Sequence, residues 1–470
     1  MKTRQSVYDV DQGALVWYSR AVGEMKKRDI SDPTSWWYQA AVHGYSNSSP
    51  FWRNATGYPP STALQNSGYW NRCQHGTWYF LPWHRMYLYY FEETVAKAVV
   101  ELGGPAGWTL PYWNYCDYLN TSASQQERQQ ALSIPPAFGT SAGPDSDSPE
   151  LWIAGRRNYV LNPRNVNPWP ALQETEFTNS AGEIEFGGGV TGFSHFGSRT
   201  GQLESLPHNV VHTDIGGAMG DPNTAALDPI FWLHHANIDR LWQVWLDTAG
   251  RENPTTGAWR AFTFKFHNAE GAPVTMAVKD AETTAQLDYE YTTSYPAPET
   301  PNPVRPVSRR ADASMDVVGA STQSTDLADT PVSVNLNMVP APMRNATLKA
   351  AAKSGTDKKT ILRINNIKGE GDVPPINVFV NSKSAKEDDD AHFVGSIGLF
   401  GLGDASTPGV ESDGGGLSFS LDASNVINQL RKAADWDEDN ISVQLVPQAK
   451  LDAAAKVNIG RVSLHSECVD

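Results

Sequence analysis

Four stretches in the first 250 residues show the apolar spacing of helices, and each has marked ends. Proline is favoured in the first turn of a helix and glycine directly after the last turn, so these stretches predict four helices. They run through WWYQAAVHG to Gly44, from Pro82 to near Gly103, from Pro207 to Gly216, and from Pro229 through IFWLHHANIDRLWQVWLD. The pattern indicates a mainly helical first domain, which we place at residues 1–293.

Short alternating runs of β-branched residues, separated by Gly, Asp and Asn, occupy the last part of the chain. Such alternation between turn formers is typical of strands. Six runs occur: TILRINNI, INVFVNS, HFVGSIGLF, LSFSLD, ISVQLVP and KVNIGRVSLH. Strands at this spacing predict a small β-sandwich over residues 336–470. The expected fold class is therefore a multidomain α+β protein.

Residues 294–335 differ from both parts, because they are dense in Pro, Ser, Thr, Asp and Ala and hold few large apolar side chains. This composition is typical of a linker or an extended surface segment. Two domains also suit the length of 470 residues, which exceeds one ordinary core. Arg305, Arg309 and Arg310 make the segment the natural site for proteolytic cleavage.

The charge balance is acidic, with 52 Asp plus Glu against 37 Lys plus Arg. Such a chain offers no basic face to a phosphate backbone, so we expect a small neutral or weakly charged substrate and no nucleic acid. Three cysteines are too few for a disulfide framework. No run is apolar enough for a membrane helix or a signal peptide. A soluble cytoplasmic protein is the default, although a secreted protein whose signal had been removed would have the same sequence.

Histidines give the clearest chemical signal, and the strongest part of it is a triplet in the second half of the helical region. His208 and His212 are four residues apart, so they point from the same face of one predicted helix. His235 on the next helix can supply a third nitrogen. This spacing predicts a metal site.

A second set of three histidines lies earlier in the chain. His43 is near a helix end, His75 is in the segment NRCQHGTWYF, and His84 is in the helix that follows. Three neutral imidazoles per metal, with no carboxylate in either set, suit copper or zinc better than calcium or magnesium. The residue types alone leave copper and zinc open.

Three motifs carry a resemblance to a known family. HGTWYFLPWHRMYLYYFEE, residues 75–93, resembles the first copper motif of tyrosinases, catechol oxidases and molluscan hemocyanins. DPIFWLHHANIDRLW, residues 228–242, resembles the second, and PHNVVH, residues 207–212, adds to the match. The resemblance covers residues 1–292, where DYEY is similar to the end of the family's catalytic domain. It implies a four-helix bundle with a dicopper centre in its core.

The same resemblance implies a reaction. Two copper ions would activate dioxygen as co-substrate, and small phenolic substrates, both monophenols and o-diphenols, would be oxidised to o-quinones. In the doublet His234-His235 the family assigns the ligand role to the second member. The implied ligands are His43, His75 and His84 for one copper, and His208, His212 and His235 for the other.

Three further residues gain a role from the resemblance. Cys73 matches a C-x-H position at which family members form a thioether to the histidine, here His75, and this bond would fix the imidazole. Phe231, one turn before His235, matches an aromatic residue that shields the coppers. Asp239, one turn after His235, is expected to accept a hydrogen bond and orient an imidazole.

Glu204 and Asn209 resemble a family pair proposed to polarise a water that takes the proton from a bound phenol. A positioned base matters more for monophenols than for the more acidic diphenols, so the pair favours monophenolase activity beside diphenolase activity. Thr213, Met219 and Pro222 belong to a stretch that borders the substrate entrance in the family, and we expect them to line the pocket.

The C-terminal region resembles the terminal domain of latent plant and fungal enzymes. That domain covers the active site and inserts an apolar or aromatic residue into it. Phe393, Leu399 and Phe400 are the candidate plug residues here. The resemblance thus implies a latent form in which the chain's own C-terminal domain acts as an intramolecular inhibitor.

Alternative functions stay open at this point. A diphenol-only catechol oxidase or an o-aminophenol oxidase would hold the same ligands and differ in pocket residues. A hemocyanin-like oxygen carrier would share the copper motifs, but hemocyanins are secreted tandem arrays, whereas this sequence holds one unit and no evident signal.

Overall fold

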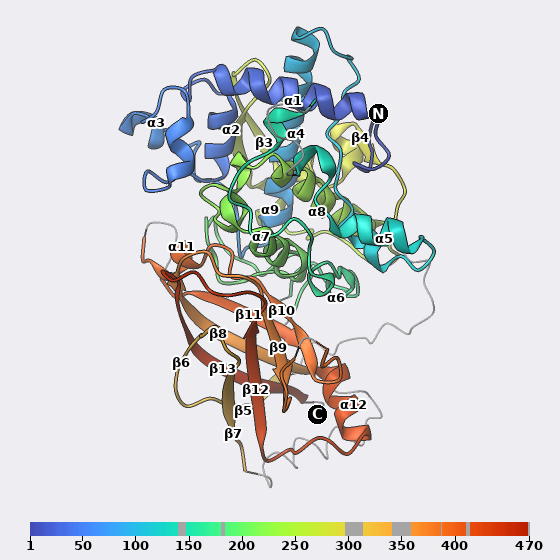
Figure 1. The fold of residues 1–470 in the computed structure, drawn as a ribbon, viewed down its shortest axis with the longest axis vertical. Helices are drawn as coiled ribbons and strands as arrows, with labels where there is room; N and C mark the ends of the chain where they lie inside the picture. The colour runs from blue at the N-terminus through green and yellow to red at the C-terminus, as the bar shows by residue number, and fades with distance from the viewer. Residues whose placement is uncertain are drawn as a thin grey trace.

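The computed structural model describes residues 1–139, 147–179, 184–296, 314–340, 359–386, 388–409 and 414–468. Helices gather in one part of the molecule and most strands in the other (Figure 1). The expected α+β arrangement is confirmed. The expected cleavage site at Arg305, Arg309 and Arg310 lies outside the described residues.

Each of the four expected helices is present. α2 begins where the Ser35 hydroxyl accepts a hydrogen bond from the backbone N–H of Tyr38, and it ends at Gly44. Nearly every residue of α8 is buried, including the polar side chains of Asn237, Asp239 and Arg240. The helices that carry histidines are α2 (Trp36–His43), α4 (Phe80–Glu101), α8 (Ile230–Asp247), and α7 (Val210–Ile215) with the kinked helical segment Glu204–Asn209 before it.

Shorter elements and an aromatic core complete the helical part. Tryptophan side chains fill the space between the helices, and Trp36, Trp83 and Trp232 are almost fully buried. The remaining elements are α1 (Gln12–Lys27), α3 (Thr62–Gln65), α5 (Gln125–Leu132), α6 (Trp169–Leu172), α9 (Gly257–Ala261), β1 (Lys2–Arg4) paired with β4 (Tyr289–Tyr291), and β2 (Thr263–His267) paired with β3 (Pro273–Ala277).

One continuous sheet forms the strand-rich part. Its strands follow the order β10-β9-β12-β7-β5-β13-β8-β11, with β6 beside β13. The two ends of this path come together, since Gly395 of β10 lies against Leu421 of β11, so the expected sandwich takes a barrel-like form. The elements are β5 (Ser314–Ala320), β6 (Thr325–Asp326), β7 (Val332–Met338), β8 (Thr360–Glu370), β9 (Ile376–Val380), β10 (Phe393–Ile397), α11 (Leu402–Ser406), β11 (Leu417–Asp422), α12 (Ser424–Lys432), β12 (Ile441–Pro447) and β13 (Lys456–Cys468).

The strand-rich part begins earlier than the sequence indicated. β5 and β6 lie inside the stretch expected to be a linker, residues 294–335, and both pair with β13. β5 reads SMDVVGA, a short strand whose few apolar residues are easily lost among the Pro, Ser and Asp around it. Its place in the sheet is decided by pairing with distant strands.

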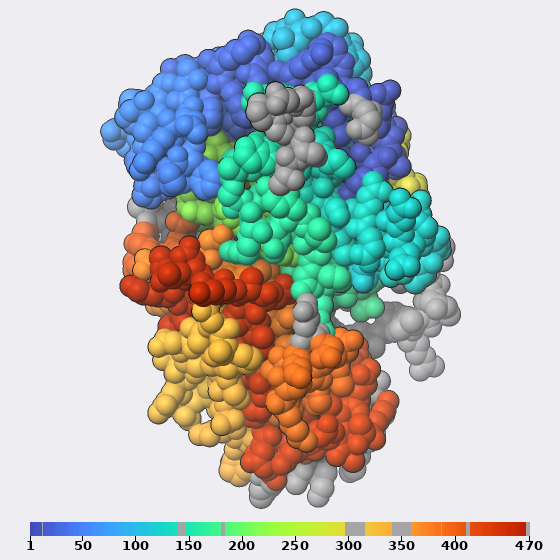
Figure 2. Space-filling view, in the orientation of Figure 1, coloured from blue at the N-terminus to red at the C-terminus, as the bar shows by residue number. Residues whose placement is uncertain are grey.

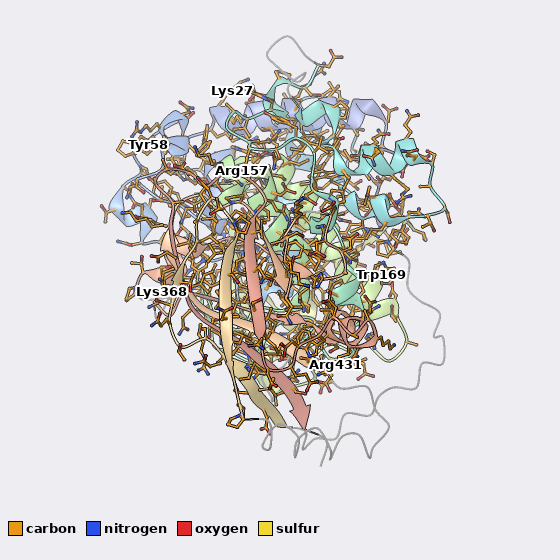
Figure 3. The ribbon with its side chains drawn as sticks, turned by 60° about the horizontal axis from the view of Figure 1, so that its bottom comes forward. Lys27, Tyr58, Arg157, Trp169, Lys368 and Arg431 are labelled. Carbon is orange, nitrogen blue, oxygen red and sulfur yellow. The ribbon has the colours of Figure 1, made fainter. Side chains whose placement is uncertain are left out.

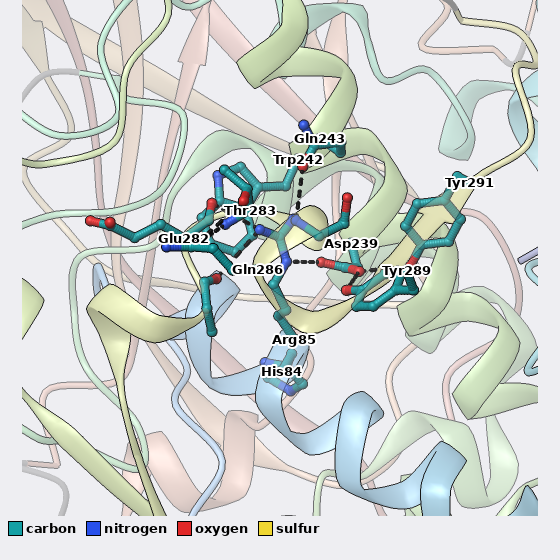
Figure 4. A network of polar contacts seen from close by, with 12 residues as sticks. His84, Arg85, Asp239, Trp242, Gln243, Glu282, Thr283, Gln286, Tyr289 and Tyr291 are labelled. Carbon is teal, nitrogen blue, oxygen red and sulfur yellow. Dashed lines mark hydrogen bonds and ion pairs between the residues drawn. The ribbon is translucent and has the colours of Figure 1, made fainter. Parts of the chain in front are cut away.

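A buried polar network joins the two helices at the centre of the helical part (Figure 4). Arg85 of α4 donates from Nε to Asp239 of α8 at 2.5 Å. Tyr289 and Tyr291 of β4 donate their hydroxyls to the other carboxylate oxygen, at 2.5 and 2.7 Å. Asp239 therefore does not orient an imidazole, and that expectation is wrong. Asp239 does lie one helical turn after His235, but its carboxylate binds Arg85 of α4 instead of an imidazole.

Replacing Asp239 by alanine is expected to lower the free energy of unfolding of the helical part by about 3–5 kcal/mol, because Arg85 would stay buried without its partner charge. Chemical denaturation followed by tryptophan fluorescence measures the change. Asp9→Ala, at an exposed position, is the control and should change stability by less than about 0.5 kcal/mol. A loss at Asp239 as small as the control's would contradict the structural role of the network.

Candidate metal centre

The first histidine trio (His43, His75 and His84) is fully buried and compact. One possible ligand atom from each lies within 4.8 Å of the others. The Nδ1 atom of His43 is 2.8 Å from the Pro222 carbonyl oxygen, and that of His84 is 2.8 Å from the Phe80 carbonyl oxygen. These carbonyls fix the protonated nitrogen at Nδ1. All three Nε2 atoms lack a hydrogen-bond partner among the described residues, as expected for atoms reserved for a metal.

The second trio (His208, His212 and His235) forms a tighter triangle. Nε2 of His235 is 3.3 Å from Nε2 of His208 and 3.2 Å from Nε2 of His212. Two nitrogens bound at about 2.0–2.1 Å to one tetrahedral ion lie about 3.3 Å apart, so the spacing fits a single ion. Nδ1 of His212 is 2.8 Å from the Met219 carbonyl oxygen, which again leaves Nε2 for the metal.

His234 also falls within the second cluster. Its Nδ1 is 3.1 Å from the Tyr115 hydroxyl, and its ring lies beside that of His208. The short Nε2 contacts belong to His235, which favours His235 as the third member and His234 as its neighbour.

The two trios lie against each other, and we call the buried region that their rings share the metal pocket. The His84 and His235 rings stack with centroids 4.4 Å apart, and those of His75 and His208 are 5.9 Å apart. Burial holds the pKa of each imidazole well below its usual value, and the neighbouring imidazoles lower it further. The rings are therefore neutral, which is the form that binds a metal.

Two phenylalanines wall the pocket. Phe231 has its ring centroid 4.2 Å from that of His235 and 4.9 Å from that of His43, in the place expected for a shielding aromatic. Phe80 lies 4.6 Å from His84 and 4.7 Å from His208 by the same measure. Phe80 was missed because its position at the start of α4 carries no signal of a metal site.

Glu204 contacts the backbone of the residue after His75, and Asn209 contacts His208. Oε1 of Glu204 accepts the backbone N–H of Gly76 at 2.8 Å, whereas Oε2 has no partner among the described residues. Burial raises the pKa of Glu204 to about 8, and the backbone N–H groups of Gly76 and Gly201 oppose this rise. Oδ1 of Asn209 is 2.9 Å from Nδ1 of His208.

The expected pocket-lining residues act mainly through their backbone. Met219 and Pro222 supply the carbonyl oxygens that hold Nδ1 of His212 and of His43. The Thr213 hydroxyl donates to the Asn209 carbonyl oxygen at 3.0 Å. Every residue has a backbone carbonyl oxygen, so the sequence could not show that these two act as acceptors.

Cys73 lies between two imidazoles. Its Sγ is 3.3 Å from Nδ1 of His75 and 3.2 Å from Nδ1 of His195, and its side chain is fully buried. The sequence predicted the first contact and missed the second, because His195 sits in a stretch without helical or strand pattern.

A segment of the strand-rich part covers the pocket, and we call residues 398–401 the cap segment. The Phe400 ring stacks on that of His212 at 4.1 Å and meets those of His75 and His208 at 5.4 and 5.7 Å. Of the three plug candidates only Phe400 reaches the trios: Leu399 packs in the core of the strand-rich part, and Phe393 lies beside Arg164.

Polar contacts hold the two parts together around this segment, and the space-filling view shows them closed against each other (Figure 2). Arg157, labelled in Figure 3, pairs with Asp372 at 2.7 Å, and the backbone N–H of Gly217 donates to the same carboxylate at 3.1 Å. Asn223 donates to Asp404 of α11 at 2.8 Å.

A family model described as the common central domain of tyrosinase matches residues 33–248. A protein of Hahella sp. (strain CCB-MM4) named tyrosinase HcTyr1 is 63% identical over 470 residues, which cover 99% of this chain and 100% of that protein. The chain belongs to the tyrosinase family. Residues 314–467 match a domain family of unknown function.

More distant members of the tyrosinase family resemble the chain as well. The latent form of a chloroplastic polyphenol oxidase from Prunus armeniaca is 26% identical over 426 residues, covering 84% of this chain and 66% of that protein. The solved structure of latent apple tyrosinase aligns with a TM-score of 0.59 at 20% identity, over 99% of this chain and 97% of that chain. A latent aurone synthase aligns with a TM-score of 0.62 at 19% identity, over 100% and 90%. These structures share the fold of both parts.

None of the helices that the structure describes combines the length and the apolar character needed to span a bilayer.

Docking of the strand-rich part is expected to weaken as the pH rises. Burial, and then the charge of Asp221, raise the pKa of Asp404 from 3.8 to about 6. A carboxyl whose pKa is raised by docking favours the docked state while it is protonated, and this contribution is lost as the pH rises through about 6. Asp221, whose pKa burial also raises, and Asp372, paired with Arg157, are the other charged groups here.

Protease release of the strand-rich part should therefore be faster at about pH 7.5 than at about pH 5, and Asp404→Asn should flatten the difference. The rate of appearance of the cleaved helical part measures it. Asp390→Asn is the control, because Asp390 also contacts the helical part but is 89% exposed. Equal pH dependence in the wild type and Asp404→Asn would refute the assignment.

Proposed function

We propose that this member of the tyrosinase family is a type-3 copper phenol oxidase that converts monophenols and o-diphenols to o-quinones with dioxygen. The observation that carries the proposal is the pair of facing histidine trios, whose neutral rings converge in a buried aromatic pocket. Imidazole ligands suit copper and zinc alike, and membership of the tyrosinase family supports copper.

The proposal gives each trio one copper ion. His43, His75 and His84 would hold one, and His208, His212 and His235 the other. When bound, the two coppers would supply dioxygen activation, either for oxygen transfer to a phenol or for two-electron oxidation of a diphenol. The trios fit this role because each offers three neutral nitrogens with no competing hydrogen-bond donor.

Other side chains prepare the pocket for the substrate. Phe231 and Phe80 exclude water from around the trios, which strengthens every electrostatic interaction there. Oε2 of Glu204 is the available acceptor for the phenol proton, received through a water. Cationic metals nearby would lower the pKa of this carboxyl and so favour its ionised form. The Asn209 amide steadies His208 and leaves its N–H group for the same water.

Oxygen consumption and quinone absorbance of the copper-loaded protein, with tyramine and with 4-methylcatechol, test the proposal. We expect both substrates to be oxidised, and faster after proteolysis between residues 296 and 314. Oxidation of neither substrate by the cleaved, copper-loaded protein would overturn it. Reversible dioxygen binding without turnover would instead indicate an oxygen carrier.

Diphenol-only oxidation is the second candidate, and one observation favours it. Nδ1 of His208 occupies one of the two acceptor positions on Oδ1 of Asn209, so this oxygen polarises a water less strongly than a free amide oxygen would. Turnover of 4-methylcatechol without turnover of tyramine would select this candidate. The proposed ligands do not distinguish o-aminophenols from diphenols, so o-aminophenols are a further candidate class of substrate.

Glu204→Gln should separate the two reactions. The variant loses the proton acceptor, so kcat/KM for tyramine should fall by about 100-fold, while kcat/KM for 4-methylcatechol should change by less than about threefold. Copper content, measured in parallel, should stay unchanged, because Glu204 contacts the Gly76 backbone. Equal losses for both substrates would show that Glu204 is not the base for the monophenol.

We further propose that the strand-rich part is an intramolecular inhibitor with Phe400 as its plug. The ring occupies the space over His212 into which a phenol ring would have to move. Phe400→Ala should raise the activity of the uncleaved protein by at least about tenfold, since about 1.4 kcal/mol less docking energy raises the open fraction of a mostly closed protein by that factor. Phe393→Ala is the matched control and should leave the activity low. A Phe400→Ala protein that stays inactive until it is cleaved would exclude the plug.

Cys73 and His75 are proposed to form a thioether once copper and dioxygen have acted. The buried Sγ already contacts the His75 ring. Peptide mass spectrometry would then find the two residues joined with the loss of two hydrogen atoms, and an intact thiol in the turned-over enzyme would contradict the bond.

A further inference from the structure

His75 is positioned differently from the other five proposed ligands. Those five lie in or at the end of helical segments, whose backbone hydrogen bonds fix the direction of each side chain. His75 lies in an irregular stretch before α4. A ligand on such a stretch needs another source of rigidity, because a looser ligand weakens metal binding.

Residues 195–199, which we call the strap, supply that rigidity by pairing with the backbone around His75. The N–H of His75 donates to the His195 carbonyl oxygen at 3.2 Å, and the N–H of Gly197 donates back to the His75 carbonyl oxygen at 2.6 Å. The N–H of Arg199 donates to the Gly76 carbonyl oxygen at 2.9 Å. The two segments thus form a short parallel bridge centred on His75 and Phe196.

Two glycines permit this close approach. A Cβ on Gly76 would lie 2.2 Å from the Gly197 carbonyl oxygen, and a Cβ on Gly197 would lie 2.3 Å from the Gly76 carbonyl oxygen. Any side chain at either position would push the strap away. The fit indicates that the contact is specific to these residues.

Side chains of the strap reach the metal pocket from behind His75. The Phe196 ring stacks on the His75 ring with centroids 5.5 Å apart and planes at 12°. Nδ1 of His195, which is buried, is 2.8 Å from the Cys73 carbonyl oxygen and 3.2 Å from Cys73 Sγ. His195 is thereby tied to both ends of the Cys73–His75 turn, through its backbone at His75 and through its ring at Cys73.

We infer that His195 is a positioning residue for the first metal site: its ring and backbone hold the turn that aims His75 at the metal. The inference rests on the proposed function, since it requires that His75 bind copper. His195 itself contacts no substrate and no metal in this account. Its Nδ1–H is the group that matters, because it makes the shorter of the two hydrogen bonds that the Cys73 carbonyl oxygen accepts, 2.8 Å against 3.3 Å from Nε2 of Gln74.

Substitutions that keep or remove this donor test the inference. Asparagine places its amide nitrogen at the same number of bonds from Cα as Nδ1, whereas glutamine places it one bond farther. We therefore expect His195→Asn to retain the site and His195→Gln and His195→Ala to weaken it. His267→Ala is the matched control, because His267 is a buried histidine that belongs to neither trio.

Copper retention is the readout, measured as copper per chain against time in an excess of chelator. In His195→Ala and His195→Gln, one copper equivalent should leave about tenfold faster than in the wild type, the usual effect of removing a partner of a ligand. The second equivalent should leave at the wild-type rate, and His195→Asn and His267→Ala should behave as the wild type.

Two outcomes would overturn the inference while leaving the proposed function intact. Wild-type release from His195→Ala would show that the donor is not needed. Faster release of both equivalents, with a lower melting temperature of the metal-free protein, would show a general structural role. A wild type that binds fewer than two coppers would instead refute the proposed function.

Discussion

Six imidazoles must stay neutral and keep one nitrogen free inside a dry aromatic core, and the rest of the helical part follows from this constraint. Burial keeps the rings neutral, and carbonyl oxygens of Phe80, Pro222 and Met219 hold Nδ1 of three of them. Nε2 is then left to face the pocket. Such an arrangement survives only if the helices cannot shift, because a displaced ring would point its unpaired nitrogen at apolar side chains.

The buried network around Asp239 meets that requirement. The network connects α4, which carries His84, to α8, which carries His235. The hydroxyls of the two β4 tyrosines donate the remaining hydrogen bonds to Asp239. A buried charge pair of this kind adds little net stability over apolar packing, but it penalises any movement that separates its members. Rigidity of the metal pocket is thus set close to the ligands, since Arg85 directly follows His84 and Asp239 lies one helical turn after His235.

The cap segment covers the pocket by packing directly on the histidine rings. The Phe400 ring packs on histidine rings and belongs to the core of the helical part, while its neighbour Leu399 belongs to the core of the strand-rich part. The ion pairs around it are partly exposed, and such pairs contribute roughly 0–1 kcal/mol each. Closure therefore depends mostly on the buried cap segment.

Sequence patterns revealed the parts of this account that depend on residue type and local spacing. The i, i+4 pair His208 and His212 and the aromatic at Phe231 could be placed because helices convert spacing into direction. The roles of Asp239 and His195 could not, since their partners Arg85 and Cys73 come from distant segments. The sequence could not distinguish Phe393, Leu399 and Phe400 as plug residues, because only the docked structure shows which side chain reaches the histidine trios.

Copper content after loading and desalting tests the central claim most directly. Two separate trios predict two coppers per chain in the wild type, one in His84→Ala, one in His212→Ala, and none in the double variant. A wild type that holds a single copper, or single variants that still hold two, would contradict the assignment of one metal to each trio.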